Sequence, residues 1–232
     1  MRIAIMQPTY LPWLGYFNLI AQADKFVFLD DVQFSRQSWQ QRNRIIVGDE
    51  MVWISVPVVT SGRMGQTIRE VEVSDTTPWR KKQLGSLSGA LARAPYGQEV
   101  IELVKPTLES RESRLCEINI ALITAIADYL ELPTSLYRSS ELACEGGRSE
   151  RLLAICRTLG GSRYLSPAGA RDYISEDGAF SDAAFPVSFQ SFSPGPYRDA
   201  APLRAGEFPS IIDAIAWTGR KNTRTLIDQE IK

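Results

Sequence analysis

Three polar side chains near the N-terminus have types and positions suited to chemistry. Gln7 follows one apolar run, and Asp30 and Asp31 follow another. Neighbouring carboxylates repel each other, which raises the pKa of one and suits it to act as a general base for an amine. An amide such as Gln7 can orient an acceptor or polarise a carbonyl. These residues favour proton transfer and carbonyl chemistry. The alternative for the aspartate pair is a strand-end cap that bonds to neighbouring backbone.

The segment 32–44 is polar, lacks a clear period and carries three arginines. An ordinary solvated connection would leave Phe34 and Trp39 in water, so we interpret this segment as the lining of a site. Arg42 and Arg44 can each hold a phosphate or a carboxylate through paired hydrogen bonds.

The other candidate binding residues are aromatic rings, amides and small residues that the predicted fold brings to the same edge of a sheet. For each ring, packing in the core is an equal alternative. The full set of predicted substrate-binding residues is Gln7, Tyr10, Trp13, Gly15, Tyr16, Gln33, Arg42, Asn43, Arg44, Ser166 and Gly169.

Composition excludes several classes of site. The chain of 232 residues has no histidine, which excludes Ser-His and Cys-His triads and every metal site that needs imidazole. Its formal net charge of −1 offers no global attraction to nucleic acid. The three cysteines form no C-x-x-C pair, and no apolar run is long enough to span a bilayer. We therefore expect a cytoplasmic protein with no stable membrane insertion, and we predict no metal-ligating residues.

The elements that position these residues begin with the run Ile3–Met6, which has the length and β-branching of a buried strand. A second such run is Phe26–Leu29, and the residues between them, from Pro12 onwards, have helical spacing. This β-α-β unit predicts parallel strands whose carboxyl ends meet at one edge, where ligands bind in open α/β sheets. The segment 163–169 repeats the strand-loop-helix pattern.

We predict one α/β domain over residues 1–232, with a Rossmann-like, mostly parallel sheet and flanking helices. Alternating apolar residues and turns over 43–73 predict a small antiparallel β meander inserted after the first β-α-β unit. Helical periodicity predicts a helical segment over about 77–131. Near the C-terminus, Ser210 has the pattern of a helix cap and Gly219 that of a helix stop.

Seven blocks of sequence resemble the WbqC-like family of bacterial polysaccharide and O-antigen gene clusters. They are IAIMQPTYLPWLGYF (3–17), DKFVFLDDVQF (24–34), RNRI (42–45), WISVPV (53–58), ARAPYG (92–97), ERLLAICRTLGGSRYLS (150–166) and FPSIIDAIAWTG (208–219). Members often have glycine where this chain has Pro167.

The resemblance implies transfer of glycine or another small acyl group onto an amino sugar of a surface glycan. We expect a nucleotide-linked or lipid-linked amino sugar as substrate. If the donor is an adenylate or ATP, Mg²⁺ on the aspartates is an equal alternative to a general base. A second hypothesis is a non-catalytic protein that binds a sugar nucleotide in the same pocket. A third is an adenylate-forming, nucleotidyltransferase-like enzyme, since residues 13–16 stand where such enzymes carry a His-x-Gly-His motif.

Overall fold

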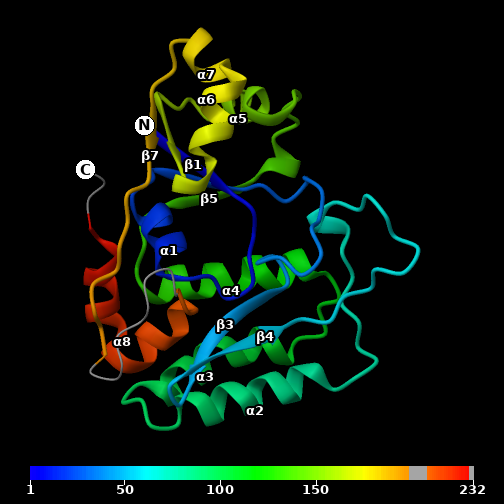
Figure 1. Cartoon of the computed structure of the whole chain (residues 1–232), viewed down its shortest axis with the longest axis vertical. Coiled ribbons are helices and arrows are strands. Elements are labelled where there is room, and N and C mark those ends of the chain that lie inside the picture. The colour runs from blue at the N-terminus through cyan, green and yellow to red at the C-terminus, as the bar shows by residue number, and fades with distance from the viewer. Residues whose placement is uncertain (199–207, 230–232) are drawn as a thin grey trace.

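The larger sheet of the structure has five parallel strands and lies in the upper half of Figure 1. The computed structural model describes residues 1–198 and 208–229. Its strands lie in the order β5-β2-β1-β6-β7, with β1 in the middle. Their bounds are β1 Arg2–Met6, β2 Lys25–Phe28, β5 Ser135–Arg138, β6 Arg163–Ser166 and β7 Val187–Phe189.

Helices cover both faces of this sheet (Figure 1). The helices of the described residues are α1 Leu14–Ala21, α2 Trp79–Leu91, α3 Gly97–Glu109, α4 Leu115–Tyr129, α5 Arg148–Thr158, α6 Arg171–Asp177, α7 Ala179–Asp182 and α8 Ile211–Ile227, with short 3₁₀ turns η1 Ile68–Glu70, η2 Ser139–Glu141 and η3 Ala168–Ala170. Of these, α2 and α3 lie away from the five-stranded sheet and pack against each other (Figure 1). None of the helices in the described part of the chain combines the length and the apolar character that crossing a bilayer requires.

The predicted β-α-β unit at the N-terminus is confirmed. β1 and β2 are parallel, with Ile3 opposite Lys25 and Met6 opposite Phe28. Successive side chains of a strand point to opposite faces. Accordingly, Ile3 and Ile5 join the core that includes residues of α5, α6 and α7, whereas Ala4 joins the core that includes residues of α1, α4 and α8. This double burial explains the unbroken apolar run.

A long insertion between β2 and β5 contains a two-stranded antiparallel sheet and three helices. The hairpin consists of β3 Arg42–Val47 and β4 Glu50–Ser55, followed by α2, α3 and α4. The predicted third strand of the meander does not form: residues 68–70 make the turn η1, and residues 58 and 73 make only an isolated bridge. Burial of Ile68 and Val71 in the core, rather than pairing, accounts for their apolar character. The α/β fold class, the hairpin and the helical segment are confirmed.

The C-terminal helix changes direction at the predicted stop. Gly219 has a φ of 72° inside α8, and a Cβ there would lie 2.8 Å from the ring of Tyr96. A residue with a side chain would therefore be strained and would collide at this position. Ser210 caps the helix, since its side chain accepts a hydrogen bond from the backbone N–H of Ile212.

Candidate functional site

A cavity of about 580 Å³ opens at the carboxyl-terminal edge of the sheet, next to the ends of β1 and β6. The chain runs outward from β1 through β2 to β5 on one side and returns to β6 on the other side. β1 and β6 therefore flank the point where the strand order reverses, which is where open α/β sheets bind ligands. The lining residues are Ile5, Met6, Gln7, Thr9, Pro12, Trp13, Gly15, Tyr16, Leu29, Ser38, Trp39, Gln40, Asn43, Arg44, Leu152, Pro167, Ala168, Gly169, Ala170, Tyr173, Gln190, Phe192 and Phe208.

The structure brings part of the predicted site together at this cavity. The predicted residues that line it are Gln7, Trp13, Gly15, Tyr16, Asn43, Arg44 and Gly169. Those that do not are Tyr10, Asp30, Asp31, Gln33, Arg42 and Ser166.

The loop that leaves β1 is held in place by two buried amide side chains. Asn43 donates from Nδ2 to the carbonyl oxygens of Tyr10 (3.0 Å) and Leu11 (2.7 Å). Asn119 of α4 donates to the carbonyl oxygens of Pro8 (3.2 Å) and Gln40 (2.7 Å). Leu11 has a φ of 42°, a conformation that a residue with a side chain keeps only when its surroundings impose it. The floor of the cavity is therefore a preorganised loop.

The side chain of Gln7 is oriented by its neighbour in the cavity. Gln40 donates from Nε2 to Oε1 of Gln7 at 2.8 Å, and Gln40 is itself fixed because its Oε1 accepts from the N–H of Ser35. Oε1 of Gln7 is thus engaged, whereas its Nε2 has no hydrogen-bond partner among the described residues and is available to donate. This makes Gln7 a hydrogen-bond donor for a carbonyl or hydroxyl oxygen.

Aromatic rings form one wall of the cavity. The centroid of the Trp13 ring lies 4.4 Å from that of Phe208 and 5.8 Å from that of Phe192. The ring also covers Gly15, where a Cβ would lie only 2.1 Å from a ring carbon. Gly15 is thus required by the packing of Trp13, and that ring fills the space where the His-x-Gly-His likeness places a nucleotide.

Sequence reasoning missed a buried amide that joins this wall to the first helix. Gln190, directly after β7, donates from Nε2 to the carbonyl oxygen of Gly15 and to Oδ1 of Asn18, both at 2.7 Å. Phe192 and Phe208 were missed as site residues as well. Phe208 begins one of the seven blocks that resemble the family, whereas nothing local in the sequence marks Gln190 or Phe192. Gln40 and Trp39 lie inside the segment 32–44, so its polar, aperiodic character was a usable signal.

The two predicted catalytic residues, Asp30 and Asp31, do not line the cavity and are engaged with protein groups. Asp30 is 1% exposed. Its Oδ1 accepts from Ser139 Oγ (3.1 Å) and the Ser140 N–H (3.0 Å), and its Oδ2 accepts from Ser140 Oγ (2.8 Å). Asp31 forms an ion pair with Arg151 of α5 and accepts from Ser139 Oγ at 2.6 Å. For Asp30 this geometry favours the alternative of a strand-end cap.

These aspartates do not fit a magnesium site. Protein donors engage both oxygens of Asp30, and Asp31 faces the positive charge of Arg151. In the described residues, no group of three or more acidic or cysteine side chains is arranged to hold a metal ion.

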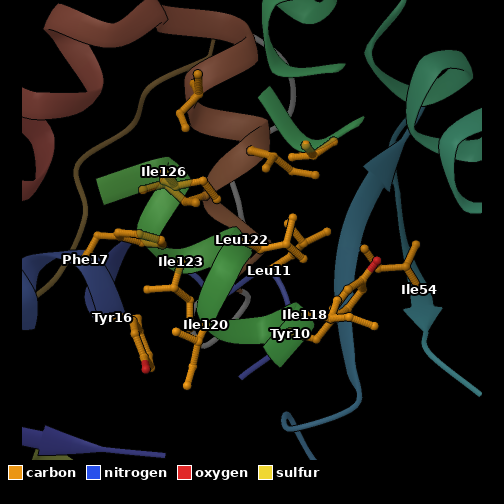
Figure 2. Close-up of a cluster of buried hydrophobic side chains, with 14 of the residues drawn as sticks. Tyr10, Leu11, Tyr16, Phe17, Ile54, Ile118, Ile120, Leu122, Ile123 and Ile126 are labelled. Atoms are coloured by element: carbon orange, nitrogen blue, oxygen red, sulfur yellow. The ribbon is translucent and has the colours of Figure 1, made fainter. Parts of the chain in front are cut away.

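The remaining predicted residues have other environments. Tyr10 is completely buried among α4 and the hairpin, as Figure 2 shows, and its burial raises the pKa of its hydroxyl. Ser166 is buried and donates to the carbonyl oxygen of Pro167. Gln33 is exposed, and its backbone forms an isolated antiparallel β-bridge with that of Thr67. Arg42 stacks on Trp53 outside the cavity.

The polarity of the lining indicates the kind of ligand that it suits. Arg44 is the one charged side chain among the described lining residues, and aromatic rings and amides make up most of the functional groups. Rings can stack on the apolar faces of sugars or bases, and Gln7, the lining amide whose donor is not engaged by another described residue, can bond a hydroxyl group. The arrangement can hold a polar ring with an anionic group near Arg44.

Comparisons with known proteins agree with the seven sequence blocks. The profile of the WbqC-like protein family matches residues 7–225. The chain is also similar to the uncharacterized protein Rv1507c of Mycobacterium tuberculosis, with 35% identity over 211 residues, which cover 90% of each chain. No solved structure matches the chain. The family profile includes every described residue that lines the cavity except Ile5 and Met6. The chain therefore belongs to the WbqC-like protein family.

Proposed function

We propose that this protein transfers glycine or another small acyl group to an amino sugar bound in the cavity next to β1 and β6. The observation that carries the proposal is the lining itself, which pairs the ring face of Trp13 with the oriented amide of Gln7 at the strand-order reversal. Such a site suits a nucleotide-linked or lipid-linked sugar.

In the proposed reaction the amine nitrogen of the sugar attacks the carbonyl carbon of an activated acyl group. The activated donor that we propose is glycyl adenylate, formed from glycine and ATP with release of diphosphate. A carbon–nitrogen bond forms, the bond between the acyl carbon and the phosphate oxygen breaks to release AMP, and the amine loses a proton. The N–H groups of Gln7 are suited to stabilise the negative charge that develops on the carbonyl oxygen. Asp31, whose side chain is 16% exposed, is the member of the acid pair that we propose as proton acceptor.

A second candidate function is binding without catalysis. One observation favours it: the described lining residues include no carboxylate, lysine or thiol that would act as base or nucleophile within the cavity itself. A protein of this kind would hold the amino sugar for a partner enzyme. We propose the cytoplasm for either function, because the free thiols of Cys116, Cys144 and Cys156 suit a reducing compartment.

A transfer assay tests the proposal directly. The purified protein is incubated with UDP-glucosamine, glycine and ATP, and mass spectrometry detects an acceptor that has gained one glycyl unit. We expect Gln7→Ala to reduce the rate by about a hundredfold, as for removal of one oxyanion donor. The matched control is Gln98→Ala, an exposed glutamine on α3, which should retain the full rate.

The same assay separates the two candidate functions. Saturable binding of UDP-glucosamine with no product supports the binding protein and contradicts the transferase. Absence of both binding and product contradicts both. Equal rates for the Gln7 and Gln98 variants would remove the proposed role of Gln7.

A further inference from the structure

Two tryptophans and two arginines form a cluster on the hairpin, next to the cavity but extending beyond it. The centroids of the Trp39 and Trp53 rings are 5.3 Å apart. The guanidinium of Arg42 lies 4.2 Å from the centroid of Trp53, and that of Arg44 lies 5.5 Å from the centroids of both rings. We call these four residues the arginine–tryptophan cluster.

The register of the hairpin explains why these residues meet. Arg44 is directly opposite Trp53 in the antiparallel pair, and Arg42 is two residues away on the same face of β3. Asn43, between them, points to the other face and is buried. Because side chains alternate along a strand, the two arginines converge above the same ring.

Both rings of the cluster are unusually exposed for tryptophan. Trp39 is 46% exposed and Trp53 is 45% exposed. Stacking on a ring buries one face of each guanidinium and leaves its planar edge for hydrogen bonding. Within residues 1–198 and 208–229, neither guanidinium has a carboxylate partner, and the Nε atoms of both are buried without a hydrogen-bond partner.

Unpaired arginines on a stacking surface are suited to oxyanions. A surface arginine without an acidic partner ordinarily extends into water, whereas these two are held in fixed positions by the rings. Fixing a guanidinium in advance reduces the entropy lost when it binds a ligand, and a guanidinium fork matches the paired oxygens of a phosphate. Two guanidinium groups on the same face of the hairpin suit the two linked phosphates of a diphosphate better than they suit a single carboxylate.

We propose that the arginine–tryptophan cluster binds the diphosphate of a diphosphate-linked sugar. Arg44 and Trp39 belong both to the cluster and to the lining of the cavity, whereas Arg42 and Trp53 lie outside the lining. The diphosphate therefore lies on the hairpin, and the sugar attached to it enters the cavity towards Gln7 and Trp13. This orientation rests on the proposed function, but the diphosphate site itself does not.

A binding experiment without any reaction tests the site. Isothermal titration calorimetry with inorganic diphosphate measures the affinity for the diphosphate group alone. Titrations with UDP-glucosamine and farnesyl diphosphate then show whether the protein prefers a diphosphate attached to a nucleotide or to a lipid. We expect Arg42→Gln to weaken binding of inorganic diphosphate about tenfold, equivalent to about 1.4 kcal/mol, because one fork is lost. Arg93→Gln, which removes an exposed arginine after α2, is the matched control and should leave the affinity unchanged.

The outcomes are decisive in each direction. Tighter binding of either extended ligand supports the diphosphate site and identifies its source. No binding of inorganic diphosphate by the wild-type protein, or equal weakening by the Arg42 and Arg93 variants, overturns the proposal. The calorimetry measures binding and no transfer. If the protein binds diphosphate but shows no product in the transfer assay, the diphosphate site is supported and only the proposed transferase is contradicted.

Discussion

At the scale of single residues, the cavity depends on buried amides that bond to backbone rather than to a ligand. Asn43 is 2% exposed, and its Nδ2 satisfies two carbonyl oxygens of the loop after β1. Predicted as a binding residue, Asn43 borders the cavity but has its donors engaged in holding this loop. Its role in binding is therefore to position neighbours such as Trp13.

Replacing Asn43 tests this positioning role. Asn43→Ala leaves the carbonyl oxygens of Tyr10 and Leu11 buried without these partners, at a cost of about 2–6 kcal/mol for the two. We expect urea unfolding to show this loss of stability. Asn222→Ala is the control, because Asn222 makes a similar bond to a carbonyl oxygen but on the exposed side of α8. Equal stabilities of the two variants would contradict the role assigned to Asn43.

We expect the two aspartates to have different roles, a structural one for Asp30 and a chemical one for Asp31. In Asp30→Asn an amide replaces a carboxylate that accepts three hydrogen bonds from Ser139 and Ser140. We expect the free energy of unfolding to fall by about 1–3 kcal/mol, with turnover per folded molecule retained. Asp31→Asn should instead abolish turnover if Asp31 accepts the proton. Calorimetric melting together with the glycyl-transfer assay measures both, and a stable but inactive Asp30→Asn would restore Asp30 as the base.

At the scale of elements, an ion pair links the edge of the sheet to the longest helix of the insertion. Arg138 at the end of β5 donates to both oxygens of Glu117 in α4, at 2.6 and 2.7 Å. These hydrogen bonds lower the pKa of Glu117 below its ordinary value of 4.5. Because the pKa is lower in the folded protein, the stabilisation is complete above about pH 4.5 and is lost as the pH falls through the folded-state value.

Acid should therefore weaken the ion pair between Arg138 and Glu117, because it protonates the carboxylate of Glu117. We expect the wild-type protein to lose more stability than Glu117→Gln as the pH falls from about 5 to below the folded-state pKa of Glu117, since the variant has no carboxylate to protonate. Melting temperatures recorded across this range measure the difference. Glu109→Gln, an exposed glutamate on α3, should behave like the wild type. A pH profile of Glu117→Gln identical to that of the wild type would show that the pair contributes nothing.

At the scale of the whole molecule, the cavity is assembled from segments that lie far apart in the chain. Gln190 bonds to the backbone of Gly15 across 175 residues of sequence. Figure 1 shows the hairpin and the carboxyl-terminal edge of the sheet as separate parts of the fold. A ligand between them should therefore restrain several distant segments at once.

Hydrogen exchange measures that restraint. With saturating UDP-glucosamine, we expect slower exchange in residues 38–44, 167–173 and 190–192 together, because each segment contributes to the cavity. The helix α2, which contributes no lining residue, serves as the internal control. Protection confined to one of the three segments would place the ligand elsewhere.

The fold was predictable where its signals are local. The apolar run of β1, the helical spacing of α1 and the stop at Gly219 depend on residues within one or two turns of each other. The prediction of a third strand in the meander was wrong because the alternating apolar residues Val71 and Val73 are buried in the core, while Val73 makes only an isolated bridge to Val58. Alternation specifies which side chains are buried, but it does not specify a pairing partner.

The sequence by itself determined the family, the fold class and the edge of the sheet at which the cavity opens, because strand and helix periodicity are local and β-α-β connections have a single hand. Only the tertiary structure decided which side chains meet there. It supplied Gln190 and Phe192 from the far end of the chain, and it paired Asp30 with Ser139, 109 residues away. Contacts of this kind arise from packing between distant segments, which leaves no pattern in the neighbouring sequence.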